Sequence, residues 1–221
     1  MYLTIYLKSI DYKCLDFAII LENKTGENHM KVITISRVYG AGGHSIGKKV
    51  AETLGIEFYD RDIIKETALA MGIDPELIKA AEEHITKGDT LLRAISPISY
   101  DYKNTIFNYE RNAIVKIASE GPCVILGRCA GEILQEEGID CLNVFLFADS
   151  IHCGKRVGEL LNTTDVNLIA REMKKQNSSR NAYFTRYTGK HLMDSQNWHM
   201  TLDTGVLGFD TCAKIICDAV Q

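Results

Sequence analysis

The stretch KVITISRVYGAGGHSIGKKVAETLGIEFY, residues 31–59, decides the fold that we expect for this chain. Its first part, Val32 to Ile35, is an apolar and β-branched run of the length that is typical of a buried strand. Three glycines follow within four positions, at 40, 42 and 43. Glycine adopts positive φ easily and lets the backbone approach a ligand closely. The stretch therefore predicts a strand that runs into a glycine-rich turn.

A helix is predicted directly after this turn. Ile46, Val50 and Leu54 recur at four-residue spacing, which indicates one buried helical face, and Gly55 ends the helix. A strand, a glycine-rich turn and a helix N-terminus form an anion site, because free N–H groups and the helix dipole point at the ligand. The simplest ligand is a nucleotide phosphate, although a plain strand–helix turn would show the same pattern. The residues that would cradle the phosphates of ATP are Gly40, Ala41, Gly42, Gly43, His44 and Ser45.

The helix register decides which residues bind phosphate. Residues 42–48 match the phosphate-loop pattern G-x-x-x-x-G-K, but that alignment would leave barely two helical turns before the closing glycine. The hydrophobic register instead places the helix start at Gly43 or His44. Gly43 then stands where the phosphate-binding lysine normally stands, and Ser45 stands where a hydroxyl binds Mg²⁺. Another cation must replace the lysine: Arg37 at the strand end is the first candidate and Lys48 the second, and either could instead be a surface cation.

Four segments of the chain resemble the cytidylate-kinase-like proteins, a divergent branch of the P-loop nucleoside monophosphate kinases. They are RVYGAGGHSIGKKVAETLGIEFYDRDII (37–64), ILGRCAGEIL (125–134), SRNAYFTRYTGK (179–190) and TLDT (201–204). The resemblance implies an α/β three-layer sandwich over residues 30–221, with a five-stranded, mostly parallel sheet flanked by helices and a basic lid at about 155–190. It also implies that a glycine in the lysine position is a habit of this branch.

The resemblance places the acceptor site across the cleft from the loop. Asp60 and Arg61 match the segment where monophosphate kinases contact the acceptor nucleotide. Arg128 matches the Gly-Arg whose arginine holds the acceptor phosphate in a bidentate fork. The residues themselves also allow Asp60 to be a helix cap, and Arg128 to pair with a structural carboxylate.

The basic segment resembles the kinase lid, which closes over both nucleotides and excludes water. Residues 155–190 contain eight Lys and Arg against three acids, a difference of +5 in a chain whose net charge is −4. Arg156, Arg171 and Arg180 are the residues best placed to reach phosphates, whereas a solvated amphipathic helix is the alternative. The Tyr-Thr-Gly-Lys stretch at 187–190 matches the family as well, without a role that the residues reveal.

Several positions depart from the family pattern. His44 stands where the family usually has arginine, and it would titrate near neutral pH. Asn177 replaces an aspartate, Cys153 an arginine, Leu192 a tryptophan and His199 an aspartate. Each change removes a charge or an aromatic contact, so the departures predict either a drifted specificity or a protein that binds nucleotide without turnover.

Composition bounds the remaining expectations. The 221 residues fit one α/β domain, preceded by an extension at 1–29 that is either an N-terminal addition or lies before a true start at Met30. The net charge of −4 argues against nucleic-acid binding, and no apolar run reaches the roughly 20 residues that cross a bilayer. Seven cysteines without a C-x-x-C pair, and no secretion signal, favour reduced thiols in the cytoplasm. The oligomeric state is open, with a homodimer as one arrangement.

Two further predictions concern local structure. Ile63, Ile64, Thr67, Ala68 and Met71 are expected on one buried helical face, and residues 88–104 are expected to form a loop. Taken together, the sequence predicts a kinase that transfers the γ-phosphoryl group of ATP, with Mg²⁺, to a nucleoside monophosphate such as CMP. The alternatives are a kinase of a non-nucleotide metabolite and a non-catalytic nucleotide-binding regulator.

Overall fold

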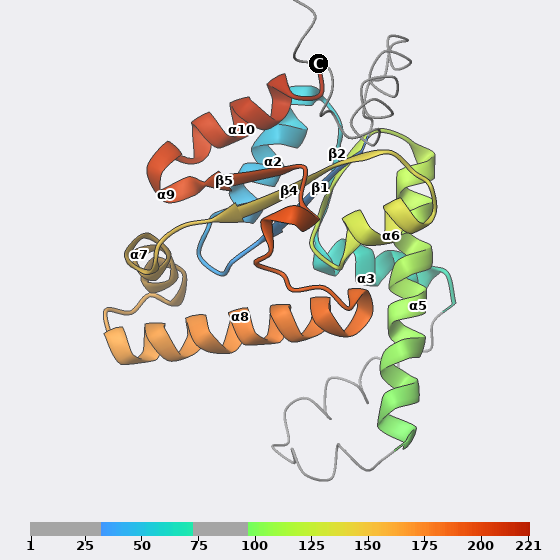
Figure 1. Ribbon diagram of the computed structural model, residues 1–221, viewed down its shortest axis with the longest axis horizontal. Helices are drawn as coiled ribbons and strands as arrows, with labels where there is room; N and C mark the ends of the chain where they lie inside the picture. Colours follow the sequence, from blue (N-terminus) through green and yellow to red (C-terminus); the bar gives the residue numbers. More distant parts are fainter. Residues whose placement is uncertain (1–31, 73–96) are drawn as a thin grey trace, which may run out of the picture.

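The structure is a computed structural model that describes residues 32–72 and 97–221 (Figure 1). The strands are β1 Val32–Arg37, β2 Glu57–Tyr59, β3 Cys123–Leu126, β4 Cys141–Phe147 and β5 Met200–Asp203. The longer helices are α2 Gly43–Leu54, α3 Arg61–Ala70, α5 Pro97–Glu120, α6 Ala130–Glu136, α7 Ser150–Leu161, α8 Val166–Thr188 and α10 Phe209–Asp218. The short elements are the 3₁₀ turn η2 Ser195–Asn197 and the helix α9 Thr204–Leu207. The predictions for residues 1–29, for a helix start at Asp74-Pro75 and for the loop at 88–96 lie outside the described residues.

The strands form one five-stranded sheet in the order β2-β3-β1-β4-β5. Every neighbouring pair in it is parallel. Helices cover both faces of the sheet, with α2 and α10 on one side and α3, α5 and α6 on the other (Figure 1). The predicted three-layer α/β sandwich is confirmed. Within the described ranges, no helix is long and apolar enough to span a bilayer.

The sheet divides the core into two layers because successive side chains of a strand point to opposite faces. Ile33 and Ile35 of β1 belong to the cluster formed with α2 and α10, whereas Val32 belongs to the cluster formed with α3, α5 and α6. All three side chains are at most 1% exposed. A strand buried on both faces explains the continuous apolar run that the sequence shows.

A crevice is expected at the carboxyl ends of β1 and β3. These strands are neighbours, but β1 leads into α2 on one face of the sheet and β3 leads into α6 on the other. Ligands of open α/β sheets bind where neighbouring strands diverge in this way. Arg37 ends β1, and Gly127-Arg128 follows β3, so the topology brings two predicted site segments together.

Two local predictions were wrong in part. Residues 97–104, expected in a loop, begin the long helix α5 at Pro97. Proline suits the first helical position, where its missing N–H and fixed φ cost nothing, so the Ser96-Pro97 pair marked a helix start and not a turn. In α3, Ile64 and Ala68 are buried as expected, but Ile63 and Met71 remain 37% and 38% exposed. The buried face of α3 is therefore narrower than predicted.

Candidate active site

The loop between β1 and α2 leaves a group of backbone donors unused. Its amides at Val38, Tyr39 and Ala41 donate to Leu146 O, Asn177 Oδ1 and Val38 O, respectively. The amides of Gly40 and Gly42, and those of the first α2 residues Gly43, His44 and Ser45, find no acceptor among the described residues. No side chain caps the helix. Free N–H groups at the positive end of a helix dipole attract an anion, as the sequence predicted.

The loop glycines are required for different reasons. Gly40 and Gly42 have φ of 92° and 78°, a left-handed conformation that other residues avoid. A Cβ at Gly40 would lie 2.7 Å from the carbonyl oxygen of Cys153, and a Cβ at Gly42 would overlap the ring of Phe209. At Gly43 the obstacle is space alone, because a Cβ there would lie 2.9 Å from Cγ of Arg37. The missing lysine therefore has a structural counterpart: the stem of Arg37 occupies the room that a side chain at 43 would need.

The Arg37 side chain extends from the end of β1 between Gly43 and Gly127. Its Nη1 lies 2.5 Å from the position that a Cβ of Gly127 would take. Within the described residues, the guanidinium makes no hydrogen bond and no ion pair. Burial, together with the nearby Arg180 and Arg128, lowers the pKa of Arg37 to about 9. At neutral pH it remains a half-buried cation that makes no ion pair with any described residue, although the nearby Asp60 carboxylate acts to raise its pKa.

Arg128 is held by strained backbone. Gly127, Arg128 and Cys129 are three consecutive residues with positive φ, at 84°, 57° and 57°. Left-handed φ costs about 1–2 kcal/mol for a residue other than glycine, and such strain is concentrated at functional sites. The turn links the end of β3 to α6 and directs the Arg128 side chain toward the crevice.

Arg128 is also paired with a buried acid. Its Nη2 lies 3.2 Å from Oε1 of Glu110, and its guanidinium lies 5.0 Å from the centre of the Tyr183 ring. Burial alone would lower the pKa of Arg128, but Glu110 together with Tyr183 and Cys129 outweighs it, and the net direction is upward. Nε of Arg128 is buried and has no partner. The pairing with a structural carboxylate, which the sequence left open, is present.

Four of the predicted arginines line one cavity of about 200 Å³ at the carboxyl ends of β1 and β3. They are Arg37, Arg61, Arg128 and Arg180. Arg180, on α8, lies 5.2 Å from the centre of the Tyr39 ring and donates to the carbonyl oxygen of Arg37 at 3.5 Å. Because like charges gather here with few acids, the cavity favours a ligand that carries several negative charges.

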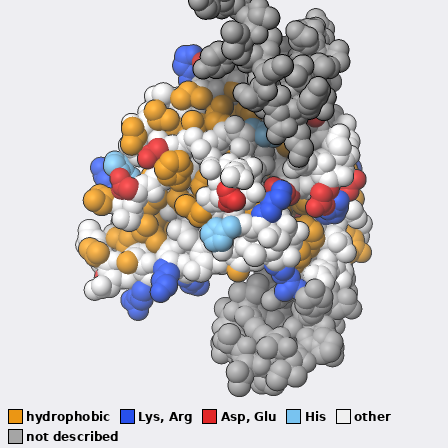
Figure 2. All heavy atoms as spheres, in the orientation of Figure 1, with side chains coloured by type: hydrophobic (Ala, Val, Ile, Leu, Met, Phe, Trp, Pro, Cys, Tyr) orange, Lys and Arg blue, Asp and Glu red, His pale blue; other side chains and the backbone are white. Residues whose placement is uncertain are grey.

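Two predicted lid arginines do not reach this cavity. Arg156 forms an exposed pair with Glu159 at 3.2 Å, and Arg171 donates to the carbonyl oxygen of Asn167 at 3.4 Å. Arg171 and Arg180 are nine residues apart on α8, which is about two and a half turns, so they point to opposite sides of the helix. Basic side chains along α8 accordingly face solvent at the lower edge of the molecule (Figure 2).

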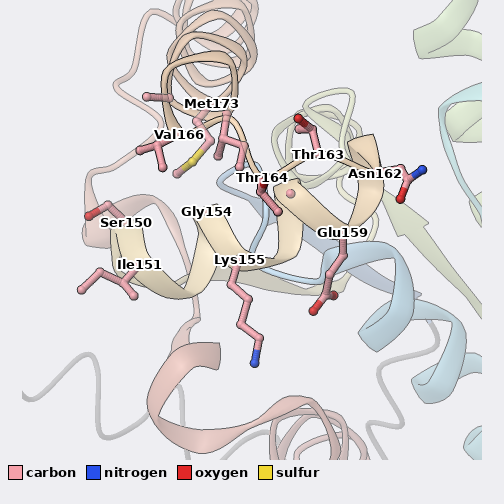
Figure 3. Close-up of a pocket in the computed structure, with 13 residues that line it drawn as sticks. Ser150, Ile151, Gly154, Lys155, Glu159, Asn162, Thr163, Thr164, Val166 and Met173 are labelled. Carbon is pink, nitrogen blue, oxygen red and sulfur yellow. The ribbon is translucent and has the colours of Figure 1, made fainter.

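A larger cavity of about 1050 Å³ lies between α7 and α8. Val166 and Met173 extend from α8 toward α7, whereas Lys155 and Glu159 extend to the other side of α7 (Figure 3). The cavity is lined by none of the predicted site residues. We therefore place the candidate site at the smaller, arginine-lined cavity.

Three other predicted residues lie beside the crevice. Asp60 caps α3, accepting from the amides of Asp62 and Ile63, and its Oδ2 lies 3.6 Å from Nε2 of His44. The His44 side chain is 62% exposed and meets the Phe58 ring edge to face. Lys48 pairs with Glu52 at 3.9 Å on the exposed face of α2, as a surface cation does. Asp60 thus has a capping role, and it does not line the arginine cavity.

The residues present fit ATP and Mg²⁺ in part. The free amides of the loop and of the first turn of α2 suit a phosphate chain. The Ser45 hydroxyl makes no hydrogen bond within the described residues, so it is available to ligate a metal. No described cluster of three His, Cys, Asp or Glu residues could hold a metal ion by itself. Mg²⁺ would therefore depend on the phosphate oxygens together with Ser45.

Sequence reasoning missed Glu110 and left Tyr183 without a role. Glu110 continues the α5 face that carries Ile106, Ala113 and Ile117, at four residues after the first and three before the second. A lone acid in such an apolar helical stripe is a signal for a buried, paired carboxylate. The sequence therefore contained the signal for a buried acid at 110, but it did not show that the partner would be Arg128, which lies on a different element.

Comparison with known proteins agrees with this geometry. The model of the cytidylate kinase-like family matches residues 32–206. Among solved structures, an uncharacterized protein from Eubacterium ventriosum ATCC 27560 is 26% identical, with a TM-score of 0.66 over 86% of this chain and 97% of that one. No curated protein matches the chain.

Two further solved structures share the fold. A gluconokinase from Sinorhizobium meliloti 1021 is 16% identical, with a TM-score of 0.52 over 87% of this chain and 92% of that one. TT1252 from Thermus thermophilus is 16% identical, with a TM-score of 0.51 over 88% of this chain and all of that one. The family match spans most of the chain, so this protein belongs to the cytidylate kinase-like family.

Proposed function

We propose that this protein transfers the γ-phosphoryl group of ATP to a small anionic acceptor, and that a pyrimidine nucleoside monophosphate such as CMP is the acceptor to test first. The family match and the kinase fold support phosphoryl transfer in general. The resemblance of Arg128 to the acceptor-binding arginine of cytidylate kinases supports the nucleotide.

One observation carries the proposal: an unpaired cation lies beside a loop of unpaired amides. The Arg37 guanidinium makes no ion pair or hydrogen bond with any described residue, and the amides of residues 42–45 have no acceptor among them. Buried polar and charged groups normally have partners, and groups left without them point to a ligand. A polyphosphate would satisfy both at once.

Each group has a separate task in the proposed reaction. The loop amides would hold the donor phosphates, and Mg²⁺ bound with Ser45 would neutralise part of their charge. Arg37 would lie between the donor loop and the acceptor cavity, where charge develops on the transferred phosphoryl group. Arg128 and Arg180 would hold the acceptor's anionic group in place. Phosphoryl transfer requires mainly such positioning and neutralisation, and little covalent chemistry from the protein.

Cavity size favours a second candidate acceptor. Pockets that enclose a drug-sized ligand usually measure about 300–1,000 Å³, and the arginine cavity measures about 200 Å³. The cavity is therefore below the usual range, which favours an acceptor smaller than a nucleotide. A compact non-nucleotide metabolite that carries an anionic group and a hydroxyl is therefore the alternative acceptor.

The Glu110–Arg128 pair favours the alternative in which the protein binds nucleotide without turnover. An arginine already paired at 3.2 Å has one less donor for an acceptor. A regulator would need the loop amides and Arg37 to bind ATP, but it would not need Arg128 to bind an acceptor.

A coupled assay for ADP release separates these candidates. Mg-ATP is combined in turn with nucleoside monophosphates and with compact hydroxylated anions, and ATP binding alone is followed by calorimetry. Turnover with one acceptor, abolished by Arg128→Ala, would support the kinase and identify its acceptor. ATP binding without turnover on either class would favour the regulator. Failure to bind ATP would overturn the proposal, because the loop would then hold no nucleotide.

A further inference from the structure

Glu110 is a buried acid that stands behind the candidate site. It lies on α5, is 4% exposed and does not line the arginine cavity. Oε1 of Glu110 lies 3.2 Å from Nη2 of Arg128, and Oε2 accepts a hydrogen bond from the Tyr183 hydroxyl at 2.7 Å. Because Tyr183 also places its ring under the Arg128 guanidinium, the three side chains form a closed group drawn from α5, α8 and the turn after β3.

The cavity itself explains why such a group is needed. Arg37 and Arg128 face the same space, and Arg37 makes no ion pair there with any described residue. Two guanidinium groups in a small, partly desolvated cavity repel each other, and the repulsion would drive the more mobile one toward solvent. Glu110 supplies the opposite charge to Arg128 and does not line the cavity, so it can hold Arg128 without occupying the ligand's place.

We infer that Glu110 is a positioning residue, which together with Tyr183 fixes the Arg128 guanidinium on the wall of the acceptor cavity. This inference rests on the proposed function, since it assigns Arg128 to the acceptor's anionic group. Arginine has five N–H donors in a fixed fork, and Glu110 takes one of them through Nη2. Nε is buried and without a partner, so the fork keeps donors in reserve.

Part of the Tyr-Thr-Gly-Lys stretch lies beside this group. Tyr187 stacks on Phe107 of α5 with ring centres 3.8 Å apart, and Gly189 ends α8 in the left-handed conformation. The carboxyl-terminal half of α8, which carries Arg180 and Tyr183, is thus attached to α5 and forms a fixed wall of the site.

The test compares two buried acids. Glu110→Gln keeps the side-chain volume and can still accept from Tyr183, but it removes the charge opposite Arg128. Glu132→Gln is the matched control, because Glu132 is also buried, at 7% exposed, and pairs with a cation that lies outside the cavity. We expect Glu110→Gln to raise the acceptor KM about 10-fold or more, the usual effect of weakening a charge-assisted hydrogen bond. The KM for Mg-ATP should change less than about 2-fold, and Glu132→Gln should change neither.

A second readout does not depend on turnover. Inorganic phosphate is titrated by calorimetry into the wild type, Glu110→Gln, Glu132→Gln and Tyr183→Phe. The Glu110 variant should bind phosphate about 10-fold more weakly, Tyr183→Phe should show a smaller loss, and Glu132→Gln should match the wild type. Thermal unfolding of each variant shows how much stability each change costs.

The outcomes separate this inference from the proposed function. If no acceptor turns over but phosphate binding follows the expected order, the proposed reaction is wrong and the positioning role of Glu110 stands. If the two acid variants lower stability and acceptor binding alike, Glu110 has only a structural role. If the wild type binds no phosphate, the assignment of Arg128 to an anion is overturned as well.

Discussion

A lysine at position 43 and an arginine at position 37 should exclude each other. A Cβ at Gly43 would lie 2.9 Å from Cγ and 3.1 Å from Cδ of Arg37, and Gly43 itself is helical, without positive φ. The glycine is therefore needed because of Arg37 and not because of backbone geometry. If Arg37 is shortened, the room above Gly43 opens, and a lysine there gains access to the phosphates in the way that other phosphate loops use one.

The expected magnitudes follow from these contacts. Arg37→Ala removes a charge-assisted contact to phosphate, which typically contributes about 1.5–3 kcal/mol, so the Kd for Mg-ATP should rise about 10- to 100-fold. Gly43→Lys alone should lower the free energy of unfolding by about 1–3 kcal/mol, because the new side chain overlaps the Arg37 stem, and it should weaken ATP binding by displacing the guanidinium. The double variant Arg37→Ala/Gly43→Lys should regain stability and bind ATP within about 10-fold of the wild type.

Calorimetry with Mg-ATP and thermal unfolding on the four proteins measure both quantities. Lys48→Ala is the control, since Lys48 lies on the exposed face of α2 beside Glu52 and its removal should change the Kd less than about 2-fold. The reasoning is refuted if Arg37→Ala and Lys48→Ala have equal, small effects. It is also refuted if Gly43→Lys is as harmful in the Arg37→Ala background as in the wild type, because the two positions would then be independent.

Further predictions concern charge and burial. Because burial lowers the pKa of Arg37 to about 9, well below the ordinary value for arginine, the folded protein binds fewer protons than the unfolded chain above about pH 9, and stability rises with pH there. Arg37→Met should therefore be more stable than the wild type at pH 8, and this advantage should shrink by about 1 kcal/mol by pH 10 in urea unfolding. Arg180→Ala should lower kcat/KM about 10-fold or more, whereas Arg171→Ala, on the opposite side of α8, should change it less than about 2-fold; equal effects would contradict the placement of the site. Burial raises the pKa of three core thiols to about 11–12, namely those of Cys123, Cys129 and Cys141. A thiol reagent at pH 8 should therefore label these positions only after denaturant is added, which peptide mass spectrometry would measure.

The loop and the core strands could be predicted because their signals are local. The β-branched run of β1, the glycines and the four-residue spacing in α2 lie within thirty residues, and each reports a backbone conformation directly. The helix start at Gly43 followed from the register of Ile46, and the structure places it there. Arg37 emerged from the same stretch, because a missing lysine beside a strand-end arginine is visible without any tertiary information.

The contacts across the site could not be predicted in the same way. Glu110 and Arg128 are separated by a helix end and a strand, and Tyr183 comes from a helix much further along the chain. The sequence shows that Glu110 is an acid in an apolar stripe, but the identity of its partner depends on how α5 and α8 pack. The prediction for Arg171 was wrong for a different reason. It relied on the basic composition of the segment, whereas the 3.6-residue period of a helix already places Arg171 on the side opposite Arg180.

Three of the positions that depart from the family pattern have structural contacts of their own. Cys153 is 2% exposed and its backbone fills the space next to Gly40, so it supports the phosphate loop from behind. Leu192 is buried and its carbonyl accepts from the indole of Trp198, while Asn177 holds the amide of Tyr39 at 2.7 Å. Neither Cys153 nor Asn177 lines the arginine cavity. Its charge comes from residues fixed at a strand end, at a strained turn and on the anchored half of α8. Arg128 is balanced by Glu110, whereas Arg37 has no ion-pair partner among the described residues, and placing such a cation in a partly buried cavity is unfavourable unless an anion joins it there.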